Sequence, residues 1–418
     1  MQERKSKSCS PWIWLPSLYF AEGLPYFIVN TISVVMFKDL GMDNGTLALI
    51  TSLIGLPWMI KPLWSPFVDI FRSKRWWIVT MQLLMALCVA LIALSAGLST
   101  FTVCLILFAL AAFASATHDI AADGFYMIAL DDRRQSAFVG IRNTFYRIAM
   151  VFGQGVLVVI AGLLQRRSGS VVTAWRGTLL VAAAILACLT VWHSFSLPRS
   201  EGRESAIGSA KGTLREFAGA FISFFSKKGV WMAVAFMLLY RLPEALSVKM
   251  LYPFFSDPAE SGGLGFDKQA YGLVYGTAGV VALLAGGILG GLHISRKGLR
   301  TCIFPMALSL ALPCVVYLLM ALFRPSSLMV VGAMIVLDQF GYGYGFTAYT
   351  VYMMRFAEGP LKTSHYAICT GFMALSMILP GAVAGYLQQS LGYVGFFILV
   401  MLCCFVTVFV SLLVRRRC

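Results

Sequence analysis

Carboxylic acids stand at four isolated positions inside long apolar stretches of this 418-residue chain. They are Glu22, Asp119, Asp123 and Asp338. An ionised side chain that faces lipid costs several kcal/mol, so acids in such places mark functional sites. A buried carboxyl group can also gain and lose a proton, because burial disfavours its charged form. We expect Asp119 to be the main proton carrier, with Asp123 and Glu22 as further candidates for proton coupling.

Basic residues in similar apolar surroundings predict contacts with an anionic solute. Arg142, Arg147 and Arg241 can bind carboxylate groups through charge-assisted hydrogen bonds. Arg241 and Glu244 are three residues apart and can also pair with each other. Nearby tyrosines offer hydroxyls and ring faces to a polar ligand, although packing explains each of them singly. The candidates for substrate binding are Arg142, Asn143, Arg147, Arg241, Glu244, Lys249, Asp338, Tyr344 and Tyr349.

The spacing of the acids and bases predicts ion pairs between neighbouring helices. Asp119 and Asp123 are four residues apart and share one helical face. If the next helix runs antiparallel with a rise of about 1.5 Å per residue, Asp123 matches Arg142 in depth, and Asp119 matches Arg147. Two readings stay open: the pairs only hold the helices together, or protonation of Asp119 releases Arg147 for substrate.

Twelve apolar segments position these residues. The chain is 59% hydrophobic and only 12% charged, so a water-soluble fold would lack polar side chains to cover its surface. Each segment has the roughly 20 residues that span a bilayer as a helix. The segments are 12–37, 44–64, 75–97, 101–130, 137–164, 176–197, 229–255, 270–292, 301–323, 328–354, 364–388 and 392–414. The sequence therefore predicts an all-α membrane protein with twelve transmembrane helices.

A polar connector divides these segments into two sets of six, a common transporter design in which substrate binds between the halves. The deep charges concentrate in the first, fourth, seventh and tenth segments, with the fifth as the exception, and scattered ion pairs would not favour every third helix. We expect a cytoplasmic tail over 1–11, a six-helix bundle over 12–197, a cytoplasmic connector over 198–228 that can hold an amphipathic helix, a second six-helix bundle over 229–414 and a basic cytoplasmic tail over 415–418.

Basic residues also predict the orientation in the membrane. Short loops on one side of the helices collect most of the Lys and Arg residues, which assigns that side to the cytoplasm. Both termini are then cytoplasmic, although Arg166, Arg167 and Arg176 run against the trend. This topology explains the net charge of +15 without a nucleic-acid partner.

Other protein classes fit the sequence less well than a secondary transporter. We find no nucleophile–base pair, HExxH or P-loop signature. The four histidines are dispersed, and the ten cysteines include no CxxC pair, so neither a metal site nor structural disulfides are expected. Deep charges of mixed sign do not form the rings of a channel. We expect no cofactor, and a membrane-embedded enzyme is the more distant alternative.

The stretch SPFVDIFRSKR at 65–75 resembles the inner-loop motif of the major facilitator superfamily. In that family an acid and spaced bases latch neighbouring helices in one state of the transport cycle. The match departs from the motif at Ser65 and Ile70, and a positive-inside loop explains the bases without a latch. With Lys61 just before the stretch, the candidates for a conformational latch are Lys61, Asp69, Arg72 and Arg75.

A longer match covers most of the chain. The segments FAEGLPY at 20–26, GLPWMIKPLWSPFVD at 55–69 and ATHDIAADG at 116–124 resemble the AmpG-type muropeptide permeases of the major facilitator superfamily. YRLPEA at 240–245, GYGFTAY at 343–349 and TSHYA at 363–367 agree more loosely. The resemblance implies a major facilitator fold of two six-helix bundles, with Lys61, Asp69, Asp119 and Asp123 as functional polar residues. His118 departs from the pattern, which has an amide side chain there.

The resemblance implies proton-coupled uptake of peptidoglycan turnover products across the bacterial inner membrane. These are N-acetylglucosaminyl-anhydro-N-acetylmuramyl saccharides, with or without peptide. We expect a monomer in membrane lipid that binds a muropeptide or amino sugar and a proton, and moves them by alternating access. Eukaryotic acetyl-CoA transporters share the pattern Lys-x-Leu-Trp-x-Pro-x-x-Asp found at 61–69. Another anionic solute, such as a nucleotide-linked acyl carrier, a sugar or a peptide, is therefore the alternative substrate.

Overall fold

The structure is a computed structural model that describes residues 10–97, 101–130, 132–198, 218–219, 221–359 and 362–415. All of the secondary-structure elements in this part of the chain are helical. Ten of its helices are long and apolar enough to span a membrane. The expected class of an all-α membrane protein is therefore confirmed.

The first half of the described chain contains long helices interrupted by short π-helical or 3-10 turns. Its elements are α1 (Pro11–Phe27), η1 (Ile28–Ile32), α2 (Ser33–Asp39), α3 (Asn44–Leu53), α4 (Leu56–Ile60), η2 (Lys61–Leu63), α5 (Ser65–Ile70), α6 (Lys74–Ser95), α7 (Thr102–Ala129), α8 (Asp132–Val151), η3 (Phe152–Leu157), α9 (Val158–Ser168) and α10 (Val171–Ser196).

The second half repeats this pattern of long and interrupted helices. Its elements are α12 (Val230–Leu239), α13 (Leu242–Ser256), η5 (Ala259–Ser261), α14 (Lys268–Leu273), η6 (Val274–Gly279), α15 (Val280–Lys297), α16 (Leu299–Ala311), η7 (Leu312–Cys314), α17 (Val315–Phe323), α18 (Leu328–Ala357) and α19 (Lys362–Arg415).

Two features explain why ten long helices are found where twelve segments are expected. The apolar stretch Asn44–Ile60, made of α3 and α4, is shorter than the other spans. α19 runs through Gly392, which has a non-helical φ of 66° and is the first residue of the last expected segment. The number of twelve spans therefore stays a prediction.

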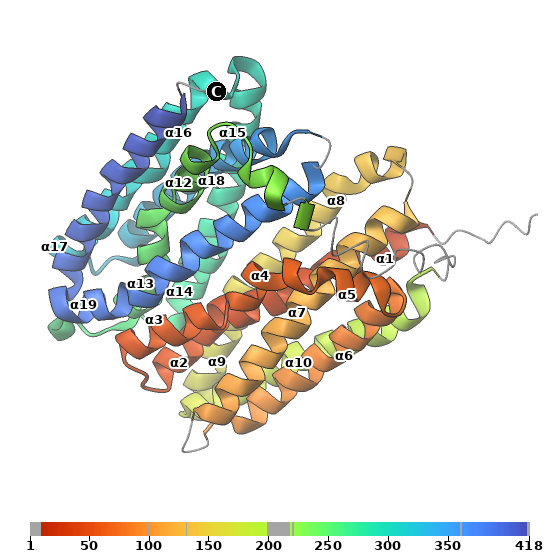
Figure 1. Ribbon diagram of the computed structural model, residues 1–418. Helices are drawn as coiled ribbons and strands as arrows, with labels where there is room; N and C mark the ends of the chain where they lie inside the picture. Colours follow the sequence, from red (N-terminus) through yellow and green to blue (C-terminus); the bar gives the residue numbers. More distant parts are fainter. Residues whose placement is uncertain are drawn as a thin grey trace, which may run out of the picture.

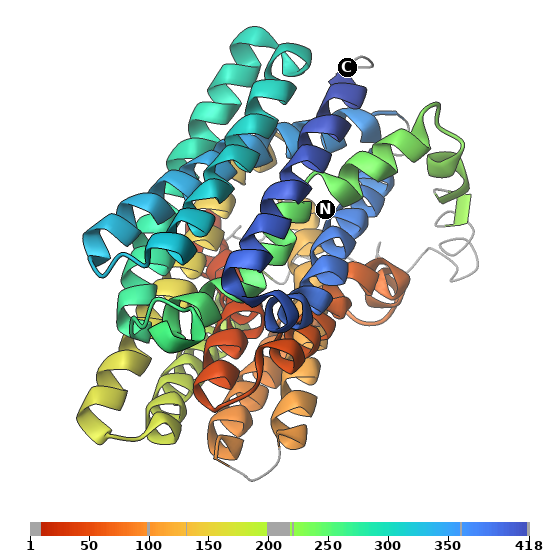
Figure 2. The same cartoon turned by 90° about the vertical axis from the view of Figure 1, so that its left-hand side faces the viewer.

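The helices form two groups that lie side by side. In Figure 1, α1 to α10 (red to yellow-green) lie together at the lower right, and α12 to α19 (green to blue) lie together at the upper left. Figure 2 shows the two groups after a turn of 90°. The largest apolar cluster runs through both groups, from Ile28 on η1 to Phe254 on α13. The boundaries expected for the bundles and the connector stay predictions, because 199–217 and 220 lie outside the described residues.

Prolines interrupt two helices that carry charged residues. Pro25 lies inside α1, and the π-helical segment η1 follows it. α12 ends at Leu239, and α13 begins at Leu242 with a proline in its first turn. Because proline cannot donate a backbone hydrogen bond, it weakens or breaks the helix on its N-terminal side. The break leaves Arg241 between two helices.

Candidate functional site

Asp119 on α7 lies beside two donors from the second apolar segment. Its Oδ2 accepts a hydrogen bond from Trp58 Nε1 at 3.0 Å and lies 3.7 Å from Lys61 Nζ. Its Oδ1 is buried without a hydrogen-bond partner. Lys61 reaches this position because the chain turns there, where the 3-10 helix η2 replaces α4. Asp119 is therefore a buried acid in which only one of the two carboxylate oxygens has polar partners.

Asp123 lies one turn further along α7 and has a strong partner. Its Oδ1 is 2.7 Å from Arg142 Nη2 on α8 and 3.4 Å from the hydroxyl of Tyr19, which donates to it. The Arg142 guanidinium also lies over the rings of Tyr19 and Tyr126, at 4.6 and 5.7 Å from their centroids. Contacts of this kind stabilise a cation in apolar surroundings. The expected ion pair between Asp123 and Arg142 is confirmed.

Glu22 on α1 completes a group of five charged side chains. It is only 6% exposed, and its Oε2 is buried without a hydrogen-bond partner. It lies within electrostatic range of all four other members. The first charged group is Glu22, Lys61, Asp119, Asp123 and Arg142.

The first charged group holds three acids and two bases. Glu22 and Asp119 are buried, and the low polarity of their surroundings strengthens the repulsion between their negative charges. A proton bound by one of the carboxylates would balance the group.

A second charged group lies at the helix break in the second half. Arg241 donates to both carboxylate oxygens of Glu244, through Nε at 2.8 Å and Nη2 at 2.7 Å, and to the hydroxyl of Tyr342 at 2.9 Å. Its guanidinium lies 4.8 Å from the ring centroid of Phe346. The local pair of Arg241 and Glu244 is confirmed. We call Arg241, Glu244 and Tyr342 the second charged group.

Other substrate-binding candidates differ in their surroundings. Asn143 and Arg147 on α8 are exposed, and Arg147 is in no ion pair within the described residues. Arg147 lies within electrostatic range of Tyr342, so α8 approaches the second charged group. Lys249 on α13 donates to the backbone oxygen of Thr51 on α3 at 3.1 Å and thereby joins the two halves.

Two of three further candidates lie close to the second charged group, because the Arg241 guanidinium is 5.9 Å from the ring centroid of Tyr349, and Asp338 shares a pocket with Glu244. Tyr344 hydrogen-bonds to His293 on α15, and Tyr349 is fully buried and donates to the backbone oxygen of Met237 at 2.7 Å. The pocket that contains Asp338 is small and is also lined by Tyr342. In the described part of the chain, no group of three or more His, Cys, Asp or Glu side chains is placed to hold a metal ion.

The expected pair of Asp119 and Arg147 is wrong. Lys61 takes the place beside Asp119, because the turn at η2 brings a residue from a helix that the depth comparison did not include.

The structure gives contacts for three of the four residues proposed as a latch, Lys61, Arg72 and Arg75. Arg72 is exposed and lies over the ring of Trp76, with 5.9 Å to its centroid. Arg75 donates to the backbone oxygen of Ser194 on α10. Lys61 contacts Asp119 instead, and the side chain of Asp69 lies outside the part of the chain that the structure describes. The latch stays a prediction.

The structure shows two sets of contacts that were not predicted from the sequence. The first contains the donors Tyr19, Trp58 and Tyr342, which contact Asp123, Asp119 and Arg241. Trp58 and Tyr342 stand in or beside the quoted motifs, which is a usable signal. The second is a set of ion pairs between the halves. Their members are far apart in the sequence, so their spacing does not predict that they pair.

These ion pairs close one end of the molecule. Lys38 on α2 pairs with Asp257, just after α13, at 2.7 Å between Nζ and Oδ1. Its neighbour Asp39 pairs with Lys268 on α14. Each pair joins the first half to the second with the charges reversed. We call Lys38, Asp39, Asp257 and Lys268 the gate.

Polar side chains around the gate extend the closure. Asn44 Nδ2 donates to Gln388 Oε1 at 2.6 Å, and the hydroxyl of Tyr393 donates to Asp257 at 2.6 Å. Gly385 on α19 lies so close to the backbone of α3 that an added Cβ would overlap the carbonyl oxygen of Asn44. α1 begins, and α19 ends, at the other end of the molecule, so the gate lies far from both termini. The halves are closed at this end.

One acid in the loop at the gate is held in its charged form. Asp43 caps α3, and its Oδ1 accepts a hydrogen bond from the Thr46 backbone N–H at 2.9 Å. Hydrogen bonds from the Thr46 side chain and backbone lower the pKa of Asp43 to about 2. Its carboxylate is therefore charged, and the cap intact, throughout the physiological pH range.

Comparison with known proteins identifies the type of molecule that carries this arrangement. The sequence model described as "Major Facilitator Superfamily" matches residues 17–379. The "Anhydromuropeptide permease" of Escherichia coli (strain K12) is 23% identical over 387 residues, which cover 91% of this chain and 75% of the relative. "Putative transporter AmpG 4" of Rickettsia conorii is 24% identical over 416 residues, which cover 96% and 95%. These relatives confirm the resemblance to AmpG-type permeases.

Solved structures agree on the fold. A bacterial homologue of the human lysosomal transporter Spinster, in an inward-facing and unoccupied conformation, has a TM-score of 0.75 at 13% identity and covers 98% of both chains. A D-xylose–proton symporter has a TM-score of 0.70 at 12% identity and covers 96% of this chain and 95% of that one. The family and these neighbours are transporters rather than enzymes. The protein is therefore a multi-pass membrane transporter, and it belongs to the Major Facilitator Superfamily.

Proposed function

We propose that this transporter takes up peptidoglycan-derived muropeptides, or related amino-sugar saccharides, together with protons across a bacterial inner membrane. The first charged group carries the proposal of proton coupling, because it contains one more acid than base, and its two buried acids, Glu22 and Asp119, each have an oxygen without a hydrogen-bond partner. The name of the Escherichia coli relative supports the substrate. Transport of another anionic solute stays the alternative.

The coupling step follows from the contacts of Asp119. While Asp119 is ionised, it attracts the ammonium group of Lys61. When Asp119 binds a proton, the attraction between opposite charges is lost, and Lys61 becomes available to a carboxylate of the substrate. Loss of the proton restores the pair and weakens the hold on the substrate. Binding of proton and substrate are thereby linked in both directions.

Substrate carboxylates have two further partners. Arg147 is exposed, and Arg241 has its guanidinium fixed between Glu244 and Tyr342. Muropeptides carry the lactyl group of the muramyl sugar and, where peptide is attached, its carboxylates. Of these two arginines, Arg147 is therefore the more accessible to an arriving anion in this conformation.

Alternating access requires that the closed end opens in another state. We assign the gate to the outer face and the two termini to the cytoplasmic face, in line with the distribution of basic residues. In this assignment the structure is closed to the outside. Alternating access needs a part of the protein that is either closed or open. The gate can serve as this part if its ion pairs and close helix contacts break together.

The substrate and the coupling are tested together in proteoliposomes. Labelled anhydro-muropeptide is offered under an inward pH gradient, against plain amino sugars and short peptides. A membrane potential of 100 mV contributes about 2.3 kcal/mol for each proton, which corresponds to about 50-fold accumulation. Glu260→Gln, in an exposed loop acid, serves as a control that should accumulate substrate like the parent protein. Equal rates for muropeptide and plain amino sugar would contradict the proposed substrate.

A further inference from the structure

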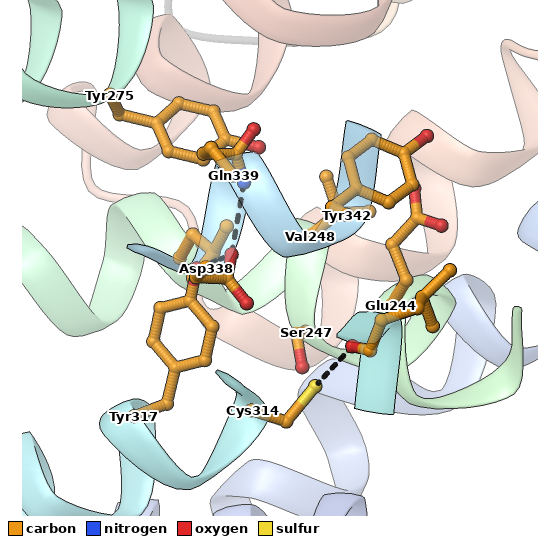
Figure 3. Close-up of a pocket in the computed structure, with 11 residues that line it drawn as sticks. Glu244, Ser247, Val248, Tyr275, Cys314, Tyr317, Asp338, Gln339 and Tyr342 are labelled. Carbon is orange, nitrogen blue, oxygen red and sulfur yellow. Dashed lines mark hydrogen bonds between the residues drawn. The ribbon is translucent and has the colours of Figure 1, made fainter. Parts of the chain in front are cut away.

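A small enclosed pocket lies in the second half. Its volume is about 30 Å³, which is room for one or two water molecules. It is lined from α13, η6, α16, η7, α17 and α18, and two of the lining residues are the acids Glu244 and Asp338 (Figure 3). A polar pocket of this size is hydrated in proteins when several groups can bond to the water.

Asp338 is the acid of this pocket that lacks a cation. It is 7% exposed, and its Oδ2 accepts hydrogen bonds from the Tyr317 hydroxyl at 2.6 Å and from Gln339 Nε2 at 3.0 Å. Its Oδ1 has no hydrogen-bond partner among the described residues. Figure 3 shows the carboxyl group of Asp338 between Tyr317 and Gln339, on the side of the pocket that faces Ser247. One oxygen is thus fixed by two donors, and the other is directed to the pocket.

The other groups around the pocket do not neutralise Asp338. Arg241 donates to both carboxylate oxygens of Glu244, so the positive charge of Arg241 is already paired with Glu244. η6 contributes the hydroxyl of Tyr275, and α18 contributes that of Tyr342. The thiol of Cys314 on η7 completes the titratable groups that line the pocket, and Cys404 on α19 lies behind it. Two acids therefore share one base in an enclosed site.

We propose that Asp338 is a second proton-binding site of the transporter, with the proton on Oδ1 donating a hydrogen bond to water in the pocket. The proton is transferred from a hydronium ion in the pocket water: an O–H bond of hydronium breaks, the O–H bond on Oδ1 forms, and a neutral water molecule is left in the pocket. The site is distinct from the first charged group, which lies in the other half. The inference deepens the proposed proton coupling, but binding of a proton at Asp338 does not require that Asp119 couples transport.

A metal cation is the competing occupant, and the contacts disfavour it. A cation such as Na⁺ needs several free oxygen ligands, whereas both oxygens of Glu244 accept from Arg241. The guanidinium of Arg241 also repels a second cation nearby. A proton needs only the single free oxygen of Asp338.

Infrared difference spectroscopy of the purified protein in lipid tests the proposal. The parent protein should show the carbonyl band of a protonated carboxylic acid at acidic pH and lose it as the pH rises. The difference between the parent and Asp338→Asn should contain one such carbonyl band, which is the band of Asp338, whereas the surface variant Glu260→Gln should keep it. Identical spectra of the parent and Asp338→Asn at every pH would overturn the proposal, as would a spectrum that responds to NaCl in place of choline chloride but not to pH.

Two further variants make the result independent of folding and of the proposed coupling. Tyr317→Phe removes a hydrogen bond to the ionised carboxylate, so the band should persist to higher pH, and the exposed-ring variant Tyr386→Phe should leave it unchanged. An unchanged titration in Tyr317→Phe would contradict the assignment. In Asp119→Asn the band of Asp338 should remain, which separates this inference from the role of Asp119.

Discussion

Lys38 and Asp257 are 219 positions apart in the chain, yet their side chains form an ion pair of 2.7 Å between the two halves of the transporter. Asp39 and Lys268 form a second pair in which the acid comes from the first half and the base from the second. These contacts hold one end closed while the charged groups lie deeper in the molecule. Breaking them should change the balance between the two access states.

Lys38→Met should shift that balance towards the state in which the gate is open. Loss of a partly buried charged hydrogen bond costs about 2 kcal/mol, so the ratio of closed to open molecules should fall about 30-fold. Distances between spin labels on the gate loops of α2 and α13 measure this ratio. The pair of Arg166 and Asp267 is much more exposed, so Arg166→Met is the control and should have a smaller effect. Unchanged label distances in Lys38→Met would show that the pair does not hold the gate.

Gly385→Ala should prevent tight closure of the same end. The added methyl group would overlap the carbonyl oxygen of Asn44, and such overpacking costs about 1–3 kcal/mol. We expect a lower melting temperature and a more open gate by the same label distances. Gly291→Ala on α15 has no atom within 4 Å of the added Cβ and should resemble the parent. A variant Gly385→Ala with parental stability and distances would contradict the close contact between α3 and α19.

Arg241 should have a structural role that can be separated from substrate binding. Arg241→Met leaves the carboxylate of Glu244 buried without its partner, which costs about 3–5 kcal/mol and should lower the melting temperature clearly. The double variant Arg241→Met with Glu244→Leu removes both charges and should recover most of the stability. Uptake should remain absent in the double variant if Arg241 also binds substrate. Recovered uptake would restrict Arg241 to holding the helix break.

Arg147→Gln should weaken binding of the substrate without loss of stability. Arg147 is exposed and in no ion pair within the described residues, so its removal leaves no buried acid behind. Loss of one charged hydrogen bond to a substrate carboxylate corresponds to about a 10- to 100-fold rise in KM. Arg300→Gln, at an exposed position at the start of α16, is the matched control. An unchanged KM for Arg147→Gln would exclude Arg147 from the binding site.

Local geometry made part of the site predictable from the sequence. Asp123 and Arg142 lie on consecutive antiparallel helices, so counting residues in depth was enough to pair them. The same method failed for Asp119, because Lys61 comes from a turn in a helix that is not next in sequence.

Long-range contacts were outside the reach of such counting. Tyr344 is the tyrosine that the sequence analysis expects to bind substrate, but Tyr342 is the one that contacts Arg241. Residues two positions apart point to opposite sides of a helix, and the sequence does not tell which side faces the site. The gate pairs depend on the packing of two halves around one another. The general fold was predictable because apolar segments of membrane length leave few alternatives.

The most direct test of the account is concentrative uptake by Asp119→Asn. Purified variant and parent protein are reconstituted, and labelled anhydro-muropeptide is followed both under an inward pH gradient and as exchange between labelled and unlabelled substrate without a gradient. We predict that Asp119→Asn keeps exchange but loses accumulation, since the carboxamide cannot release a proton. Accumulation by Asp119→Asn equal to that of the parent would contradict the role of Asp119 in coupling.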